Sequence, residues 1–225
     1  MDDRLLDVAG AARFFLDSCH NPDPPIDPVE LAAMWDLEVV HAPGPAATIG
    51  GFITHDPDRE PWQQRFDIAH ELGHLAAHHV GLPSTCPTAS EIAGAILVPE
   101  QDFKRQLSRT AWDLAQLVGR YEVSWEVLAR RLPRTVACVA TIIDNGDIWY
   151  RERSRWVTNQ GGPHPKRLEP WEKELVTEAA GSERHVYADN LVTAYSVPSP
   201  GYDRVVLVAG VEEWEARTYR AMAAE

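Results

Sequence analysis

The sequence has few cysteines and no long apolar run. Its three cysteines, Cys19, Cys86 and Cys138, are odd in number, widely spaced and without a CxxC pair. This pattern argues against both a disulfide framework and a structural zinc knuckle, so we expect reduced thiols. No stretch approaches the roughly 18 apolar residues that a membrane helix requires. The acidic start Met1-Asp2-Asp3-Arg4 is not followed by the apolar segment of a secretory signal, so we expect a cytoplasmic protein.

Basic residues are also scarce in this chain of 225 residues. Lys and Arg number 21 against 34 Asp and Glu, which gives a formal net charge of −13. Such a charge opposes nonspecific attraction to nucleic acid, because phosphate binding depends on clustered Lys and Arg. We therefore expect a protein partner, without direct DNA or membrane binding. The 44% of hydrophobic residues is sufficient for a buried core.

The most informative pattern present is His70-Glu71-Leu72-Gly73-His74, within an apolar-flanked run that predicts a helix over 62–79. On an α-helix, residues four apart are offset by about 40° and rise about 6 Å, so the two imidazoles can converge on one ion. Glu71 lies about 100° round the helix, beside the position that a catalytic metal site keeps open for water. The pattern therefore predicts a metal hydrolase with Glu71 as general base.

A third metal ligand must come from outside this motif, because a catalytic zinc usually takes three protein ligands. Glu91 is the favoured donor, since it begins the apolar segment 91–99 that we predict as a second helix. The small residues Ala93-Gly94-Ala95 would let this helix approach the first one closely. Two histidines and a glutamate are a known catalytic zinc set. The alternative for Glu91 is a helix N-terminal carboxylate favoured by the macrodipole.

Other donors lie nearby. His78 follows His74 on the same face, but it would sit roughly 12 Å from His70 along the axis, too far to bind the same ion. We interpret His78 and the adjacent His79 as histidines that support the site or end the helix. Cys86 precedes Glu91 in a predicted loop. We favour a small, partly buried loop residue there, with an inhibitory or redox-sensing thiolate near the metal as the alternative.

These residues resemble the ImmA/IrrE family of metalloendopeptidases. The family pattern runs approximately Arg-Phe-Thr-x-Ala-His-Glu-Leu-Gly-His, followed by a glutamate that opens a helix ending in Leu-x-Pro. The matching positions are Arg65, Phe66, Ala69 to His74, Glu91, Leu97 and Pro99. The resemblance covers residues 24 to 132 and departs at Asp67, where Thr or Ser is usual, and at Asp36, where Gly is usual.

The resemblance implies that His70, His74 and Glu91 are the metal ligands and that Glu71 is the catalytic residue. It implies a zinc (Zn2+) endopeptidase, with Mn2+ or another divalent ion as the alternative metal. Family members typically cleave a helix-turn-helix (XRE-type) repressor and so release stress-response or mobile-element genes. Two other functions stay open: a noncatalytic metal-binding transcriptional regulator, and a small-molecule amidase with a closed pocket. Candidate oxyanion donors are His55, His78, His79, Arg65 and Tyr121.

The periodicity of the whole chain predicts an α+β fold. We expect a zincin-like metallopeptidase domain over 1–134 and a smaller, β-rich α+β C-terminal domain over 135–225 that senses a ligand or positions the substrate. In the first domain we expect further helices at 4–18 and 28–35, and strands at 39–40 and 51–54. In the second, Asn145-Gly146 predicts a type I′ hairpin between strands at 136–143 and 148–151, followed by a helix at 170–180, strands at 186–197 and 205–209, and a helix at 212–224.

Segment 109–134 has the outline of a helix-turn-helix. It predicts a helix at 111–118, a turn through Gly119, and a helix at 125–132 that Pro133 stops. The segment carries five Arg against three acidic residues. This bias is modest, so we favour a role in completing the catalytic domain over contact with DNA.

Overall fold

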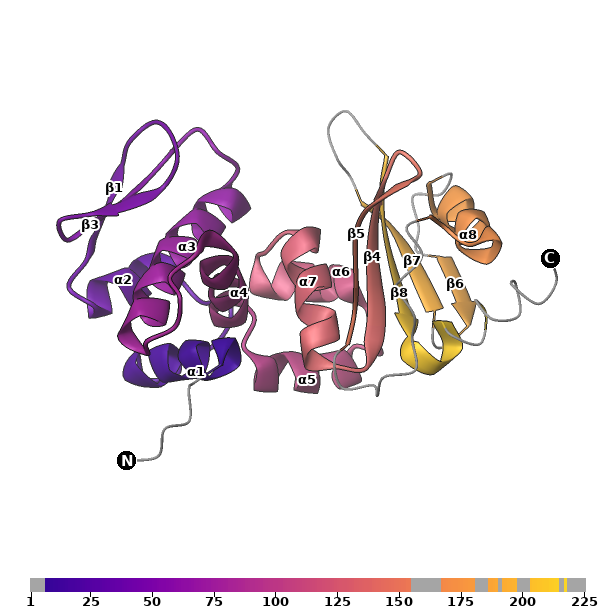
Figure 1. Cartoon of the computed structure of the whole chain (residues 1–225), viewed down its shortest axis with the longest axis horizontal. Coiled ribbons are helices and arrows are strands. Elements are labelled where there is room, and N and C mark those ends of the chain that lie inside the picture. Colours follow the sequence, from indigo (N-terminus) through magenta and orange to yellow (C-terminus); the bar gives the residue numbers. More distant parts are fainter. Residues whose placement is uncertain are drawn as a thin grey trace. The chain divides into compact units, whose positions relative to one another are not determined.

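The computed structural model describes residues 7–154, 167–180, 186–189, 192–197, 203–214 and 217. They form a mixed α+β structure with two sheets, which confirms the predicted fold class (Figure 1). The chain divides into two compact units, Met1–Leu128 and Ala129–Glu225. This division falls inside helix α7 (Trp125–Thr135), whereas the sequence analysis places the domain boundary after residue 134. The functional roles of the two domains stay a prediction.

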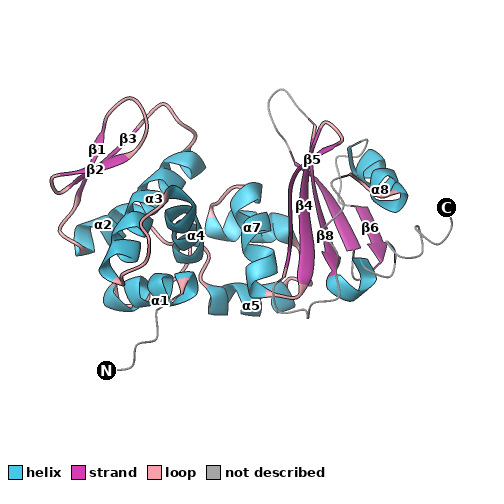
Figure 2. Ribbon diagram, in the orientation of Figure 1, coloured by secondary structure: helices cyan, strands magenta, loops and turns pink. Residues whose placement is uncertain are grey.

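The first unit is built around a long helix, α3 (Pro61–His79), with α4 (Cys86–Leu97) packed alongside it (Figure 2). Helix α1 (Val8–Ser18) packs against both α3 and α4, and α2 (Pro28–Met34) packs against α3. Asp27 caps α2 with its side chain and Pro28 occupies the first turn, as expected from the sequence. The central side chains of the resulting core are Phe15, Leu31, Ile53, Leu72, Ile92 and Ile96.

A small sheet lies against α3. Its strands are β1 (Glu38–His41), β2 (Ala47–Ile49) and β3 (Phe52–His55), with β3 in the centre, parallel to β1 and antiparallel to β2. Strand β2 was not predicted from the sequence, because three residues are too short to show an alternating pattern. Gly50 and Gly51 connect β2 to β3 with φ angles of 55° and 91°, a left-handed conformation that glycine adopts without strain.

Helix α4 begins earlier than the sequence analysis expects. Thr85 caps it, with its hydroxyl accepting from the Thr88 backbone N–H, and Cys86 is its first residue. Glu91 therefore lies inside the helix and does not begin it. Cys86 is exposed and helical, so the expectation of a partly buried loop residue was wrong.

The helix-turn-helix-like segment also differs in detail. After α5 (Glu100–Arg109), helix α6 runs over Leu114–Tyr121 and contains Gly119, which was predicted to turn. The turn is instead made by Glu122, whose φ of 51° is left-handed. Pro133 does not stop α7, which continues to Thr135, and the Val136 N–H still bonds the Leu132 carbonyl. The missing N–H of Pro133 lies only two residues before the end of the helix, where few bonds remain to be lost.

The second unit contains an antiparallel five-stranded sheet in the order β5-β4-β8-β7-β6. Helix α8 (Pro170–Ala180) covers one face of it (Figure 2). The predicted hairpin at Asn145-Gly146 is confirmed, with φ angles of 51° and 84°. The strands are β4 (Cys138–Asp144), β5 (Asp147–Arg153), β6 (Val186–Asp189), β7 (Val192–Val197) and β8 (Arg204–Gly210).

Four sequence-based predictions fall partly on residues outside the described set. The first two are the start of the first helix at 4–6 and residues 158–166 of the Gly/Pro-rich segment 158–170, which the sequence predicts as an exposed loop. The others are positions 190–191 of the predicted strand segment 186–197 and most of the final helix after residue 214. Of the helices in the described part of the chain, none has the length and apolar character to cross a membrane.

Candidate metal centre

Helix α3 presents His70 and His74 one turn apart on the same face. Their ring centroids are 4.8 Å apart and the rings are nearly perpendicular, with an interplanar angle of 86°. Both side chains are half-buried. The helical repeat thus brings two imidazoles together without help from the rest of the fold.

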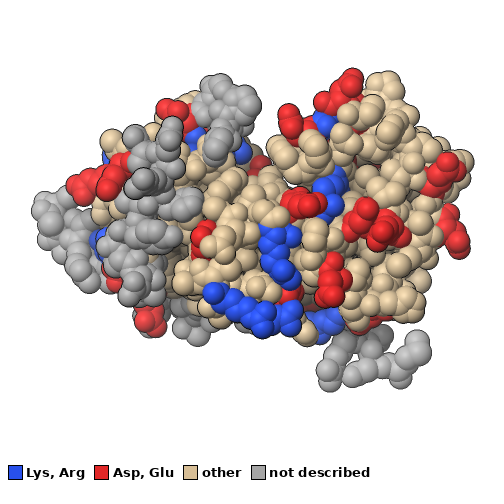
Figure 3. All heavy atoms as spheres, turned by 180° about the vertical axis from the view of Figure 1, so that it is seen from behind, with Lys and Arg blue, Asp and Glu red and all other residues tan. Residues whose placement is uncertain are grey.

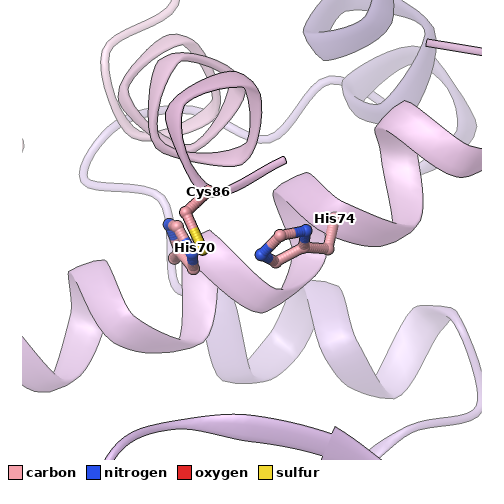
Figure 4. A group of neighbouring side chains, drawn as sticks. All are labelled: His70, His74 and Cys86. Atoms are coloured by element: carbon pink, nitrogen blue, oxygen red, sulfur yellow. The ribbon is translucent and has the colours of Figure 1, made fainter. Parts of the chain in front are cut away.

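The third donor in this group is Cys86. One ligand atom from each of His70, His74 and Cys86 lies within 4.8 Å of the others. Figure 4 shows the Cys86 side chain beside His70, with the His74 ring turned toward them. Among the described residues this group does not include Glu91, whose assignment as a metal ligand stays a prediction. The two imidazoles and the thiol are donors that suit zinc and other borderline or soft divalent ions.

Ser84 contacts both the backbone and the ring of His74. Its hydroxyl donates to the His74 carbonyl oxygen at 3.2 Å and lies 2.9 Å from Nδ1 of the same residue. A hydroxyl has one proton, so when that proton is on the carbonyl, the ring contact is made by Nδ1–H of His74 donating to Ser84. The lone pair of Nε2 is then free, which is the form of imidazole that binds a metal.

Ser90 makes the corresponding contact to the other ring. Its hydroxyl, on α4, lies 3.1 Å from Nδ1 of His70. Burial lowers the pKa of His70 and the neighbouring His74 lowers it further, so the ring is neutral near pH 7. A neutral imidazole binds a metal without first losing a proton. The donor set therefore fits a divalent ion.

Gly73 explains why α4 can supply these contacts. A Cβ atom at this position would lie 2.4 Å from the carbonyl oxygen of Ala89, a distance that no side chain tolerates. Glycine inside the motif therefore permits the close approach of α3 and α4. That approach brings Ser90 and Cys86 against the two histidines.

Glu71 lies on α3 beside the edge of the small sheet. Its side chain is 8% exposed, and its Oε2 accepts a hydrogen bond of 2.9 Å from the Thr48 hydroxyl. Thr48 belongs to β2, the strand that the sequence analysis missed. The structure thus adds Thr48 to the candidate site, and no sequence signal distinguished it.

Asp67, the departure from the family pattern, lies one turn before His70. Burial raises the pKa of Asp67, and an ion pair of 2.7 Å with Arg59 opposes that rise. The carboxylate thus belongs to the charge environment of His70. Asp67 is not one of the three donors His70, His74 and Cys86.

Two of the candidate oxyanion donors, Tyr121 and Arg65, bind other groups of the protein. Tyr121 is buried, and its hydroxyl donates to Asp102 at 2.8 Å. Arg65 donates to the Ile26 carbonyl at 2.8 Å and forms an ion pair of 3.3 Å with Glu122. Of the histidine candidates, His79 stacks on Phe14 and lies edge-on to Trp35, and His55 packs against His41.

Comparison with known proteins finds a family model and similar solved structures. Residues 36–133 match a family model described as the IrrE N-terminal-like domain, of a peptidase family. No curated protein matches the chain. A Mycobacterium tuberculosis transcriptional regulator has a similar solved structure, with a TM-score of 0.68, 18% sequence identity, and coverage of 90% of this chain and 75% of that chain. The family match spans both α3 and α4, so it contains the whole donor group.

Proposed function

We propose that this chain, whose residues 36–133 match the IrrE N-terminal-like domain of a peptidase family, is a metal-dependent endopeptidase. One observation carries the proposal: α3 places the buried carboxylate of Glu71 next to two imidazoles whose Nδ1 atoms contact serine hydroxyls. A metal site that served structure alone would have no use for a general base at this position. We propose zinc as the ion, with His70, His74 and Glu91 as its protein ligands in the active state.

In the proposed hydrolysis the bound ion, Glu71 and Thr48 have different roles. A bound divalent ion would polarise the scissile carbonyl and lower the pKa of water from 15.7 toward about 7. Glu71 takes the proton from the attacking water and passes it to the leaving amine. Thr48 holds Oε2 of Glu71, which leaves Oε1 for the proton. Burial of Glu71 strengthens this electrostatic coupling, because the local dielectric is low.

The edge strand β2 favours a peptide substrate over a small molecule. In the described sheet β2 pairs with β3 on one side, so its other edge can accept an extended peptide as an added strand. Thr48 connects this edge to Glu71. Ile49, the last residue of β2, is 64% exposed, and Phe52, which pairs with it from β3, is also exposed. These two side chains provide apolar surface for a substrate side chain.

We propose a helix-turn-helix repressor as the protein substrate. The family resemblance supports this class of partner. The charge balance also supports it, because a chain with a formal net charge of −13 attracts a basic DNA-binding protein and repels DNA. Its cleavage would release the genes that the repressor controls, which include stress-response or mobile-element genes in the family.

A noncatalytic transcriptional regulator is the second candidate function. The His70, His74 and Cys86 group supports it, because structural zinc sites close with protein ligands and often include cysteine. Two arginines of the helix-turn-helix-like segment weigh against DNA contact, since Arg120 pairs with Asp102 at 3.2 Å and Arg134 with Glu152 at 3.3 Å. On the face seen in Figure 3, Asp and Glu side chains lie among the Lys and Arg side chains.

The test is cleavage of a helix-turn-helix repressor, chosen from the genes that neighbour the gene of this chain. Wild type with zinc or manganese should cut it, and wild type with chelator should not. Glu71→Gln should lower the cleavage rate by about 10³-fold while retaining the metal. Glu30→Gln, on the exposed surface of α2, is the matched control and should cut normally.

The outcomes separate the candidate functions. Normal cleavage by Glu71→Gln would mean that Glu71 is not the base. Metal-dependent binding to operator DNA, with intact repressor in every sample, would favour the regulator. Hydrolysis of short amides at rates that do not rise with peptide length would favour an amidase.

A further inference from the structure

The three cysteines differ sharply in their surroundings. Cys19 and Cys138 are buried, and burial raises the pKa of the Cys138 thiol to about 12. Cys86 is exposed and is the cysteine that lies against two histidines. A reagent in solution can therefore reach Cys86 much more readily than either buried thiol.

The geometry places the Cys86 sulfur close to a coordinating distance. Zinc binds imidazole nitrogen at about 2.0 Å and thiolate sulfur at about 2.3 Å, so tetrahedral donors lie roughly 3.5 Å apart. The donor atoms of His70, His74 and Cys86 already lie within 4.8 Å of one another. A displacement of about 1 Å brings all three to one ion.

The two histidines and Cys86 differ in how easily their side chains can move away from a bound ion. His70 and His74 project from the middle of α3, whose neighbours Leu72 and Ala76 are fully buried. Cys86 is the first residue of α4 and follows an exposed segment, 83–85. Its side chain can turn away from the histidines without disturbing the core.

We propose that the Cys86 thiolate is a displaceable ligand that holds the position an active site needs for water. This inference rests on the proposed endopeptidase function. The resting protein is then closed, and chemical modification of the sulfur opens it. Hydrogen peroxide is the class of oxidant that we assign to this step.

Hydrogen peroxide oxidises the Cys86 sulfur by two electrons. The Cys86 thiolate attacks one oxygen of the peroxide, the O–O bond breaks and an S–O bond forms. The products are a sulfenate and one water molecule, and the peroxide is reduced by two electrons. One thiol in solution converts the sulfenate to a mixed disulfide and hydroxide, and a second thiolate then displaces the Cys86 thiolate as it forms a disulfide with the first, so reducing thiols reverse the opening.

The test uses the full chain loaded with cobalt(II) in place of zinc. A thiolate ligand gives cobalt a charge-transfer band in the near ultraviolet, which imidazole and carboxylate ligands do not give. Wild type and Cys138→Ala should show the band, and Cys86→Ala should lack it. Cys86→Ala should still bind one equivalent of cobalt. Peroxide should remove the band from wild type as mass spectrometry detects oxidation of Cys86.

A cleavage assay on the same samples tests the closure. Cys86→Ala should cut the repressor at least about tenfold faster than untreated wild type, and peroxide should bring wild type close to that rate. Absence of the band from wild type, its persistence in Cys86→Ala, or equal cleavage rates would overturn the proposal. Loss of cobalt binding in Cys86→Ala would also overturn it, because the cysteine would then be a permanent ligand.

If the chain is not an endopeptidase, the results differ from those that would overturn the role of Cys86. In that case the band would follow Cys86 as expected, but no variant would cut the repressor with zinc or manganese. The cysteine would then stand as a ligand of a noncatalytic site. The spectroscopic result thus separates the coordination from the hydrolysis.

Discussion

The two units each bury a glutamate, and the two glutamates are held very differently. Glu172 in the second unit is 0% exposed and accepts from Arg151 at 2.7 Å, from the Trp214 indole at 3.0 Å and from the Glu169 backbone N–H at 2.9 Å. Glu71 in the first unit is 8% exposed and accepts from the described part of the chain one hydrogen bond, from Thr48. A carboxylate can accept about four hydrogen bonds. Glu172 is nearly saturated, whereas Glu71 keeps most of its capacity.

Hydrogen-bond partners can distinguish a structural carboxylate from one that takes part in chemistry. A buried carboxylate with a full set of donors has no free lone pair for a reacting proton. A buried carboxylate with unused acceptor sites lacks that compensation, so its place in the fold needs another explanation. For Glu71 the adjacent histidines provide that explanation.

The largest expected effect on stability is therefore at Glu172. Glu172→Gln removes the negative charge from the 2.7 Å ion pair with the Arg151 guanidinium, which is 4% exposed. We expect the second unit to lose about 3 kcal/mol of stability against unfolding. Glu71→Gln should change the stability of either unit by less than about 1 kcal/mol. Hydrogen exchange of the β4 and β8 amides measures the stability loss caused by Glu172→Gln. A larger stability loss from Glu71→Gln would contradict the difference between the two glutamates.

Asp102 extends the comparison to a third buried carboxylate. It is 7% exposed and accepts hydrogen bonds from Tyr121, Arg105, Gln106 and Arg120. Burial alone would raise the pKa of Asp102, but these hydrogen bonds outweigh it and hold the pKa below its ordinary value of 3.8. Like Glu172, Asp102 is saturated and connects helices α5 and α6.

Asp102→Asn should therefore cost about 2 kcal/mol in the stability of the first unit near neutral pH. A lowered pKa contributes stability that is fully present above 3.8 and is lost as the pH falls through the folded value. The difference between wild type and variant should thus be constant near neutral pH and shrink below 3.8. Urea unfolding at several pH values measures it, and a difference that grows in acid would contradict the assigned sign.

Local geometry made part of the site predictable from sequence. The spacing of His70 and His74 brings two rings to one helix face whatever the rest of the fold does, and the structure shows them together. The same holds for the hairpin at Asn145-Gly146, where two positive φ angles select the residues. Short-range rules of this kind need no tertiary information.

Contacts between different helices and strands were harder to predict from the sequence. Thr48 reaches Glu71 from a three-residue strand without a periodic signal, and Cys86 reaches the histidines because α4 begins at Cys86, capped by Thr85. The start of α6 at Leu114 depends on positive φ angles at Ala111 and Trp112, which the sequence does not announce. These features depend on packing, which one sequence does not specify residue by residue.

Ser84 tests whether the serine contacts prepare the histidines for a metal. Ser84→Ala frees Nδ1 of His74 and removes the preference for the tautomer with an open Nε2. We expect zinc affinity to fall by about 10- to 100-fold, measured by competition with a chelator. Ser108→Ala on α5 is the matched control, because the Ser108 hydroxyl also donates to a backbone carbonyl. Equal affinity in both variants would mean that the serine does not set the tautomer.

The smallest effect should come from Thr48, and it bears directly on how Glu71 is held. Thr48→Val removes the hydroxyl with little change in shape, so Glu71 stays buried but loses its 2.9 Å hydrogen bond. We expect kcat to fall by about tenfold with KM nearly unchanged, because the bond orients the base and does not bind substrate. Thr54→Val is the control, since the Thr54 hydroxyl donates to the Ala47 carbonyl in the same sheet. Equal losses in the two variants would point to the position of β2 as the cause and would remove Thr48 from the site.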